Sequence, residues 1–316
     1  MSAFWQDKRV LVTGASGFLG RHLVEVLAEK GCQPITPTHK EYDLVEQAEV
    51  GRLLADFRPQ MVFHLAALVG GIWTNQRRPG EFFYNNAMMT TMVMHEAWRA
   101  GVAKLVTCIG GCSYPATAAV PIREESLWEG YPQAESAPYA LAKRMAVVQA
   151  QAYRDQYGFN AVVLVPGNMY GSYDNFNLEE AHVIPALVRR FHEAKEKDAP
   201  WVVVWGSGRP TRDFVYVRDV AEALAYAAEH YDGADIINIS SGTEVSIQEL
   251  AETIAWLVGY QGQIAWDATK PDGQMRKVFA TQRMERLLGF RATTPLEEGL
   301  RTTIGWFQEN YALARL

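Results

Sequence analysis

A short apolar run followed at once by three closely spaced glycines constrains the chain more than any other feature of its sequence. Residues 9–13 are typical of a buried strand, and apolar residues then recur at helical spacing over residues 19–28. Three glycines stand between the two segments: Gly14, Gly17 and Gly20. Glycines at this spacing allow a tight turn and a close approach of the backbone to a pyrophosphate, which a helix N-terminus attracts. The pattern predicts a strand, a loop and a helix that bind a dinucleotide.

The rest of the chain continues this alternation of strands and helices. Further apolar runs of strand length lie at 61–66, 103–109 and 160–165, and helical segments at 86–100 and 138–157 separate them. Such an order favours an α/β fold of the Rossmann type, with a doubly wound parallel sheet.

After about residue 170 the elements become shorter, and turns rich in glycine, proline and aspartate separate them. We therefore predict two parts. Residues 1–170 form a dinucleotide-binding Rossmann domain, to which strands from about 214–240 are added. Residues 171–316 mainly form a smaller C-terminal substrate-binding lobe.

Composition excludes several classes of protein. The 316 residues include 30 Lys and Arg against 36 Asp and Glu, so the net charge is −6 and no nucleic-acid partner is expected. Three cysteines supply neither a disulfide framework nor a set of metal ligands, so no metal is expected. No apolar stretch approaches the roughly 18 residues of a membrane span, and residues 1–8 lack the apolar run of a signal peptide. We expect a cytoplasmic protein with no membrane contact.

The type of dinucleotide depends on the end of the second strand, where NAD-binding proteins usually carry an acidic residue. Residues 36–40 place a hydroxyl, the His39 imidazole and an ammonium there instead. Because no carboxylate in this segment would repel a 2′-phosphate, NADP is favoured over NAD, although a solvated basic turn would have the same composition. Asp43 and Leu44 are candidate contacts on the adenine side.

Tyr139 and Lys143 form a second constellation. Residues four apart share one face of a helix, so both side chains can reach one site. An ammonium beside a phenol favours the phenolate, and we therefore expect Lys143 to lower the pKa of Tyr139, which can then exchange a proton with a sugar oxygen. The pair lies well beyond the glycine loop and behind four predicted strands, which favours a catalytic role over an ordinary helix surface.

With these motifs, the chain resembles the extended short-chain dehydrogenases/reductases that act on nucleotide sugars, and among them the GDP-L-fucose synthase family. The resemblance covers essentially the full length. The shared stretches are residues 64–67, 69–72, 112–115, 138–140, 168–171, 174–176, 182–187, 203–208 and 270–273.

The resemblance implies an NADPH-dependent enzyme that epimerises a GDP-4-keto sugar at C-3 and C-5 and then reduces C-4. Tyr139 and Lys143 would serve the reduction, while Cys112 and His182 would exchange protons on opposite faces of the ring. A homodimer through helices 86–100 and 138–157 is also implied. The expected cofactor contacts are Gly14, Ser16, Gly17, Phe18, Leu19, Gly20, His39, Asp43, Leu44, Leu65, Ala66, Ala67, Asn86, Tyr139, Lys143, Pro166, Asn168 and Met169. The expected substrate contacts are Asn168, Asn175, Arg190, Trp205, Arg212 and Lys277, with Arg276 as an alternative to Lys277.

One position departs from the superfamily pattern. A serine or threonine that orients the reacting oxygen would stand at Gly110, which is followed by Gly111. Loss of an oriented donor typically costs on the order of 10² to 10³ in rate. Reduction could therefore be slow, use Ser113 or Thr107, or be absent, which would leave an epimerase.

Two further alternatives remain open at this point. The glycine pair could make room for a bulkier sugar, so a hexose and a heptose are both possible substrates. A non-catalytic dinucleotide-binding regulator would also fit the fold.

Overall fold

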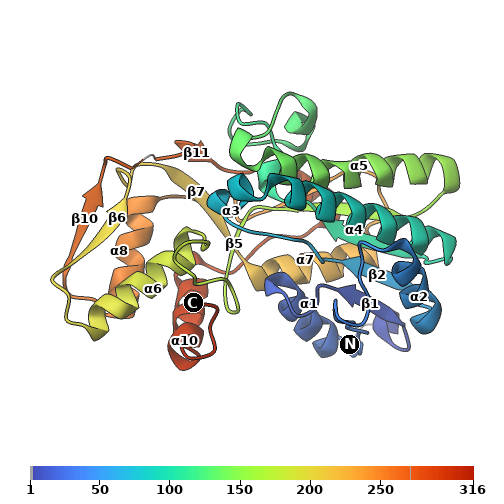
Figure 1. Ribbon diagram of the computed structural model, residues 1–316, viewed down its shortest axis with the longest axis horizontal. Coiled ribbons are helices and arrows are strands. Elements are labelled where there is room, and N and C mark those ends of the chain that lie inside the picture. The colour runs from blue at the N-terminus through green and yellow to red at the C-terminus, as the bar shows by residue number, and fades with distance from the viewer. Residues whose placement is uncertain (1–2, 271) are drawn as a thin grey trace.

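The computed structural model describes residues 3–270 and 272–316 and shows two lobes side by side (Figure 1). Met1, Ser2 and Pro271, the last from the shared stretch 270–273, lie outside the described residues. The larger lobe contains a five-stranded parallel sheet in the order β1-β2-β3-β4-β8. Its strands are β1 (Val10–Thr13), β2 (Met61–His64), β3 (Lys104–Cys108), β4 (Ala161–Pro166) and β8 (Ile237–Ile239).

Helices cover both faces of this sheet, which explains why its strands are almost continuously apolar in sequence. Leu11, Val62 and Leu105 point to one face and Val12 and Phe63 to the other, and all are buried. The first face packs against α2 (Gln47–Phe57), α4 (Pro79–Arg99) and α5 (Ala137–Tyr157). The second packs against α1 (Phe18–Glu29), α7 (Val217–His230) and α9 (Gln282–Leu288). The predicted Rossmann-type α/β fold is confirmed.

The smaller lobe has its own hydrophobic core. Its helices are α6 (Val183–Glu196), α8 (Ile247–Val258) and α10 (Leu296–Glu309). Its strands are β5 (Asn168–Tyr170), β7 (Thr211–Tyr216), β9 (Glu244–Ser246) and β11 (Arg276–Lys277) in one sheet, and β6 (Trp201–Trp205) and β10 (Gln263–Asp267) in another. The shorter helices of the chain are η1 (Ala3–Trp5), α3 (Ile72–Arg77), η2 (Gly111–Ser113), η3 (Glu124–Trp128) and η4 (Ala134–Ser136).

The two late strand segments belong to different sheets, whereas the sequence analysis assigned both to the first. β8 pairs with β4 in the central sheet, but β7 pairs with β5. The reason is that the chain leaves the central sheet at Gly167, directly after β4, and β5 offers β7 a parallel partner from Asn168 onward. The division of the chain at residue 170 stays a prediction.

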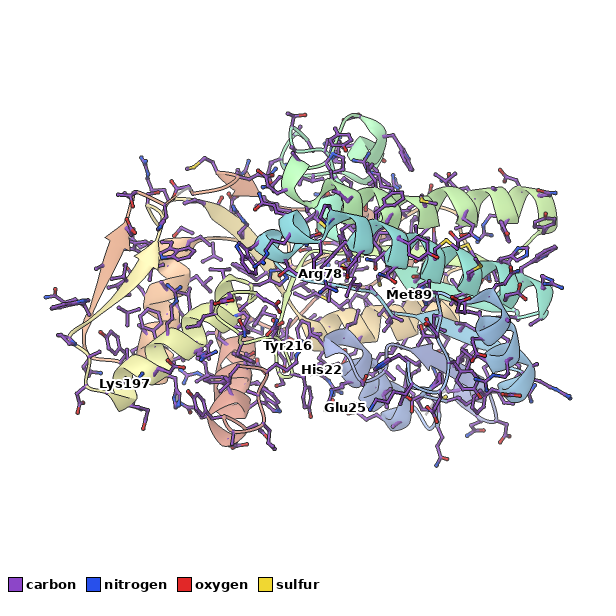
Figure 2. All side chains as sticks on the ribbon, viewed as in Figure 1. His22, Glu25, Arg78, Met89, Lys197 and Tyr216 are labelled. Carbon is purple, nitrogen blue, oxygen red and sulfur yellow. The ribbon has the colours of Figure 1, made fainter. Side chains whose placement is uncertain are left out.

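The two lobes meet where α1 touches the segment after β5. His22 of α1 is 5% exposed, and its Nε2 lies 3.1 Å from the carbonyl oxygen of Ser172. Its ring also contacts Tyr173 and Tyr216, and Figure 2 shows His22 and Tyr216 at this junction. The helix that follows the glycine loop is thus fixed to the smaller lobe. Within residues 3–270 and 272–316, no helix has the length and apolar character needed to cross a membrane.

Candidate active site

The glycine loop lies between β1 and α1 at the carboxyl end of the central sheet. Gly14 has a φ of +73°, and a Cβ at this position would lie 2.6 Å from the backbone nitrogen of Ala66. A Cβ at Gly20 would lie 2.1 Å from the carbonyl oxygen of Gly14. Only glycine therefore allows this packing of loop, helix and neighbouring strand. Gly17 caps α1 and has no side chain, so the first N–H groups of the helix can bind an anion.

The second strand is reduced to a single bridge between Leu11 and Ile35, and the turn after it contains a group that the sequence analysis missed. The carboxylate of Glu41 accepts hydrogen bonds from the backbone nitrogen and the hydroxyl of Thr38, at 2.8 and 2.7 Å. These bonds lower the pKa of Glu41. A carboxylate is thus present near the expected 2′-phosphate position, and its hydrogen bonds hold it against Thr38. His39 and Asp43 are exposed beside this turn.

Asn86 was expected among the cofactor contacts as a residue that fixes the loop geometry near the cofactor, and its side chain is bonded to the loop after β2. Its Nδ2 donates to the carbonyl oxygens of Leu68 and Phe82, and its Oδ1 accepts from the nitrogen of Leu68. Asn86 is 1% exposed and fixes the loop geometry. In front of that loop, Thr13 Oγ1 lies 2.9 Å from Nδ1 of His64, whose pKa burial lowers to about 3.

Tyr139 and Lys143 lie one turn apart on α5, near its N-terminal end. Burial raises the pKa of Tyr139, and the nearby thiols of Cys112 and Cys108 raise it further. Burial also lowers the pKa of Lys143. The expected lowering of the Tyr139 pKa by Lys143 is therefore wrong for this state of the protein, because desolvation of the phenolate dominates. Tyr139 is a protonated phenol at neutral pH.

Cys112 lies beside Tyr139, and Gly110 marks the position between them. A Cβ on Gly110 would lie 3.2 Å from Sγ of Cys112 and 3.9 Å from the hydroxyl oxygen of Tyr139. Burial raises the pKa of Cys112, while the charges of Lys277 and Lys143 lower it to a smaller extent. The thiol and the phenol therefore face the same small volume over Gly110.

The glycine pair has two different functions. A Cβ on Gly111 would lie 2.4 Å from Cζ of Phe279, a buried ring of the segment after β11. The Phe279 ring thus fills the space over Gly111, which leaves no room there for a sugar. Gly110 borders the reactive groups.

His182 is the residue before α6, and the smaller lobe brings it to the site. The loop that carries it is docked on the loop after β2: a Cβ at Gly71 would lie 3.0 Å from the carbonyl oxygen of Glu180, and Thr74 donates to the Glu180 carboxylate at 3.4 Å. His182 is accessible to solvent, yet the surrounding protein lowers its pKa by desolvation, and the charge of Lys277 lowers it further.

The charge of Lys277 on β11 lowers the pKa of both members of the candidate acid/base pair, Cys112 and His182. Burial lowers the pKa of Lys277 itself. Its neighbour Arg276, the alternative to Lys277, is exposed and forms an ion pair with Glu244 at 2.7 Å. Of these two cations, only Lys277 faces the site.

The other expected substrate residues lie on the smaller lobe. Arg190 donates to the carbonyl oxygen of Val203 and lies 5.4 Å from the ring of Trp205, which is 60% exposed. Arg212 is on β7, directly across from Lys277 in the register of β11. Asn168 donates to the carbonyl oxygen of Asp213, and the Oδ1 of Asn175 accepts from the nitrogen of Asn177.

Both hydroxyls suggested as substitutes for the missing serine are buried. Thr107 is fully buried and donates to the carbonyl oxygen of His64 at 2.7 Å. Ser113 is also fully buried, beneath the loop that carries Cys112. Thr107 points into the protein from β3, whereas the Ser113 hydroxyl has no hydrogen-bond partner among the described residues, so a substitute role for either stays a prediction.

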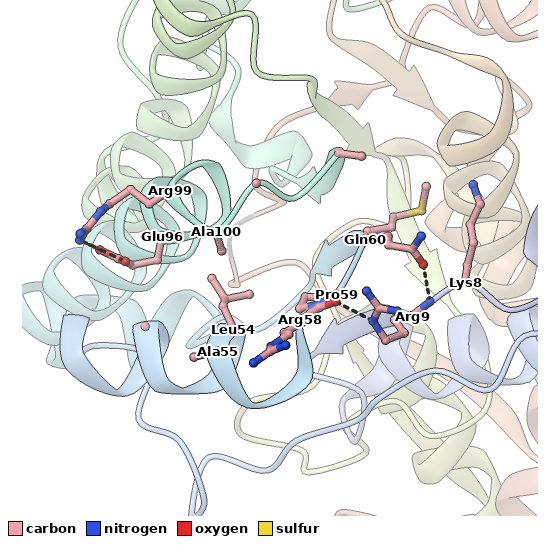
Figure 3. Close-up of a pocket in the computed structure, with 14 residues that line it drawn as sticks. Lys8, Arg9, Leu54, Ala55, Arg58, Pro59, Gln60, Glu96, Arg99 and Ala100 are labelled. Carbon is pink, nitrogen blue, oxygen red and sulfur yellow. Dashed lines mark hydrogen bonds and ion pairs between the residues drawn. The ribbon is translucent and has the colours of Figure 1, made fainter.

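A pocket lies at the opposite edge of the central sheet, at the amino ends of β1 to β3 (Figure 3). Its volume is about 650 Å³, and Lys8, Arg9, Arg58 and Arg99 are among its lining residues. Arg58 and Arg99 stand at the C-terminal ends of α2 and α4, where cations complement the helix dipole. This pocket lacks the titratable side chains gathered at the other edge and is not the candidate active site.

Fold and site together define a class: Rossmann-type α/β proteins that carry a tyrosine–lysine pair and a separate lobe beside a dinucleotide loop. The chain belongs to the NAD dependent epimerase/dehydratase family, which matches residues 10–240. The expectation of an enzyme from this superfamily is confirmed.

Individual relatives are similar over nearly the full length. A GDP-L-fucose synthase of Sinorhizobium fredii is 42% identical over 305 residues, which cover 96% of this chain and 97% of the relative. The crystal structure of a GDP-L-fucose synthetase from Naegleria fowleri bound to NADP is 30% identical, with a TM-score of 0.90 and coverage of 98% and 97%. A GDP-6-OMe-4-keto-L-xylo-heptose reductase from C. jejuni is 27% identical, with a TM-score of 0.90 and coverage of 96% and 98%.

Proposed function

We propose that this chain is an NADPH-dependent GDP-4-keto-sugar 3,5-epimerase and 4-reductase, with the activity of a GDP-L-fucose synthase. The observation that carries the proposal is the position of Cys112 beside Tyr139 over Gly110. The charge of Lys277, which lowers the pKa of both Cys112 and His182, supports a site that includes the imidazole. The names of full-length relatives support the GDP-linked substrate. A hexose is the favoured sugar, since the curated relative is a fucose synthase, although a heptose reductase shares the fold.

The residues of the glycine loop fit a dinucleotide, because side chains at Gly14 or Gly20 would collide with backbone. The free N–H groups at the start of α1 would hold the pyrophosphate. When bound, NADPH supplies the hydride for reduction of the sugar. The structure of an NADP-bound relative supports NADP over NAD, whereas the Glu41 carboxylate weakens the argument from charge in the turn at His39.

For the reduction, Tyr139 is the proton donor. Its raised pKa keeps the hydroxyl protonated, so it can give a proton to the sugar O-4 as the carbonyl carbon is reduced. Lys143 is 4% exposed and lies one turn further along α5, where its charge can stabilise the tyrosinate that proton donation leaves behind.

For the epimerisation, Cys112 and His182 form a pair that carries one proton between them. Burial raises the pKa of the thiol and lowers that of the imidazole, so the resting pair is a neutral thiol and a neutral imidazole. One member can give a proton while the other accepts one, as inversion of a carbon beside a ketone requires. Lys277 is the cation whose charge lowers the pKa of both groups, and it can stabilise the enolate formed between the two proton transfers.

The GDP moiety would bind on the smaller lobe. Arg212 and Lys277 are adjacent across β7 and β11, and an arginine fork suits a diphosphate oxygen pair. Arg190 stands beside the exposed ring of Trp205, which offers a flat apolar face to a purine base.

The test is product analysis in deuterated water with GDP-4-keto-6-deoxy-mannose and NADPH. We expect deuterium at C-3 and C-5 of the sugar and one NADPH consumed for each product. Cys112→Ala and His182→Ala should each abolish deuterium entry. Deuterium entry without NADPH consumption would instead support an epimerase that lacks reduction, which the glycine at position 110 favours. NADPH binding with neither reaction would identify a dinucleotide-binding regulator.

We also propose a homodimer through α4 and α5, which pack together on one face of the sheet. Met145 and Val148 of α5 are 41% and 53% exposed, and Met88 and Met92 of α4 are half-buried, whereas Val93 and Val147 lie in the core. The exposed apolar residues on the outer side support the interface. Light scattering should give the mass of two chains, and Val148→Glu should shift it to one. The cytoplasmic location stays a prediction.

A further inference from the structure

We propose that the Cys112 thiol has a second role in this chain: it donates the hydrogen bond to the reacting O-4 that a serine or threonine at position 110 would otherwise provide. This inference rests on the proposed function and concerns the reduction of C-4. It makes Cys112 a catalytic residue of both half-reactions.

The first argument is geometric. The position of a Cβ on Gly110 lies 3.9 Å from the Tyr139 hydroxyl oxygen and 3.2 Å from the Cys112 Sγ. A sugar carbonyl oxygen that approaches the Tyr139 hydroxyl over Gly110 therefore comes close to the thiol as well.

The second argument compares the thiol with two nearby hydroxyl groups, those of Thr107 in β3 and Ser113 in η2, by their exposure. Thr107 is fully buried with its hydroxyl bonded to the His64 carbonyl, and Ser113 is fully buried. The Cys112 side chain is partly accessible, and its Sγ is the atom nearest to the position that a Cβ on Gly110 would take.

The third argument concerns protonation. A thiol can donate only while it keeps its proton, and burial favours that form of Cys112. In the reduction, the carbonyl π bond breaks, the carbon receives a hydride and O-4 receives the Tyr139 proton. The S–H bond stays intact throughout and only polarises the carbonyl. Since a thiol is a weak donor, the effect is smaller than that of a serine hydroxyl.

The experiment separates the redox step from epimerisation by running it backwards. GDP-L-fucose and NADP⁺ are mixed with the enzyme, and NADPH formation is followed by its absorbance. Cys112→Ala should lower the rate of NADPH formation by at least about 10-fold. The loss should be smaller than the 10² to 10³ that is typical when a strong donor is removed. Cys112→Ser should keep the redox rate within a few-fold and still lose deuterium exchange, because a serine hydroxyl donates well but does not ionise as a thiol does.

Gly110→Ser in the Cys112→Ala background should restore the redox rate. The backbone at Gly110 is extended, with φ of −82° and ψ of 152°, and removal of Sγ clears the one close contact of the new side chain. Cys32→Ser is the matched control, since Cys32 is a buried thiol of the core remote from the site. It should leave the rate unchanged.

Two results would overturn the inference. A Cys112→Ala variant that oxidises GDP-L-fucose as fast as the parent would show that the thiol makes no such bond. Failure of Gly110→Ser to restore a slowed double variant would show that Cys112→Ala acts through the folding of the loop. If the parent enzyme forms no NADPH from this substrate, the proposed 4-reductase activity fails, and the inference fails with it.

Discussion

Gly111→Ala should destabilise the protein although it adds only one methyl group. The new Cβ would lie 2.4 Å from Cζ and 2.9 Å from Cε1 of Phe279. Carbon atoms in contact prefer about 3.5 to 4.0 Å, so the ring must retreat by more than about 1 Å. Phe279 is 1% exposed, and a Cβ at Gly167 would already lie 3.3 Å from its Cδ2, which shows that the ring has little free space.

Overpacking of this kind costs about 1 to 3 kcal/mol, and the depth of the overlap places Gly111→Ala near the upper end. In a chain of this length, about 1 kcal/mol shifts the melting temperature by roughly 2 °C. Thermal unfolding followed by circular dichroism should therefore show a decrease of about 4 to 6 °C.

Gly110→Ala is the matched control, because it adds the same methyl group one residue earlier. Its closest contact is the movable Sγ of Cys112 at 3.2 Å, and its backbone is extended. The expected change is below about 1 kcal/mol. Phe279→Leu should restore part of the loss in the Gly111→Ala variant, with a coupling of about 0.5 to 3 kcal/mol. Equal melting temperatures for both alanine variants, or strict additivity with Phe279→Leu, would refute the argument that Phe279 requires glycine at 111.

The remaining predictions concern activity. Tyr139→Phe should abolish NADPH consumption but leave deuterium entry into the 4-keto sugar, because the phenol serves only O-4; loss of both signals would contradict separate roles. The rate of deuterium entry should fall in acid through a pKa below 6.5, since burial lowers the pKa of His182 and a protonated imidazole leaves the pair with no proton acceptor. It should fall again in alkali as the Cys112 thiol ionises through a pKa above 9.0, and a rate that falls in neither acid nor alkali would exclude the pair. Gly20→Ala should weaken NADPH binding at least about 10-fold by calorimetry, because its Cβ would lie 2.1 Å from the Gly14 carbonyl oxygen.

The fold and part of the site follow from local sequence pattern. Gly17 and Gly20 are required by contacts with Gly14 and Ala15 in the same loop, and a four-residue spacing is enough to bring Tyr139 and Lys143 to one helix face. These features depend on backbone geometry that a short segment determines by itself. The same holds for the buried strands of the central sheet.

Other features depend on contacts between distant segments, which spacing does not reveal. Of the two candidate substrate contacts, Arg276 is bound by Glu244 in an ion pair, which leaves Lys277 as the candidate at the site. The requirement for Gly111 comes from Phe279, 168 positions later in the chain. The raised pKa of Tyr139 follows from desolvation, a property of the packed site. Glu41 could have been found from its sequence alone, as an acidic residue three positions after Thr38 in a tight turn.

The docking of the His182 loop on the loop after β2 has an evolutionary consequence. Glu180 accepts a hydrogen bond from Thr74 and packs against Gly71, whereas Tyr139 lies on the long helix α5 of the larger lobe. Substitutions at a few positions of this loop could thus abolish epimerisation and leave the hydride transfer unchanged. A descendant of such a chain could become a pure reductase without any change to its cofactor cradle.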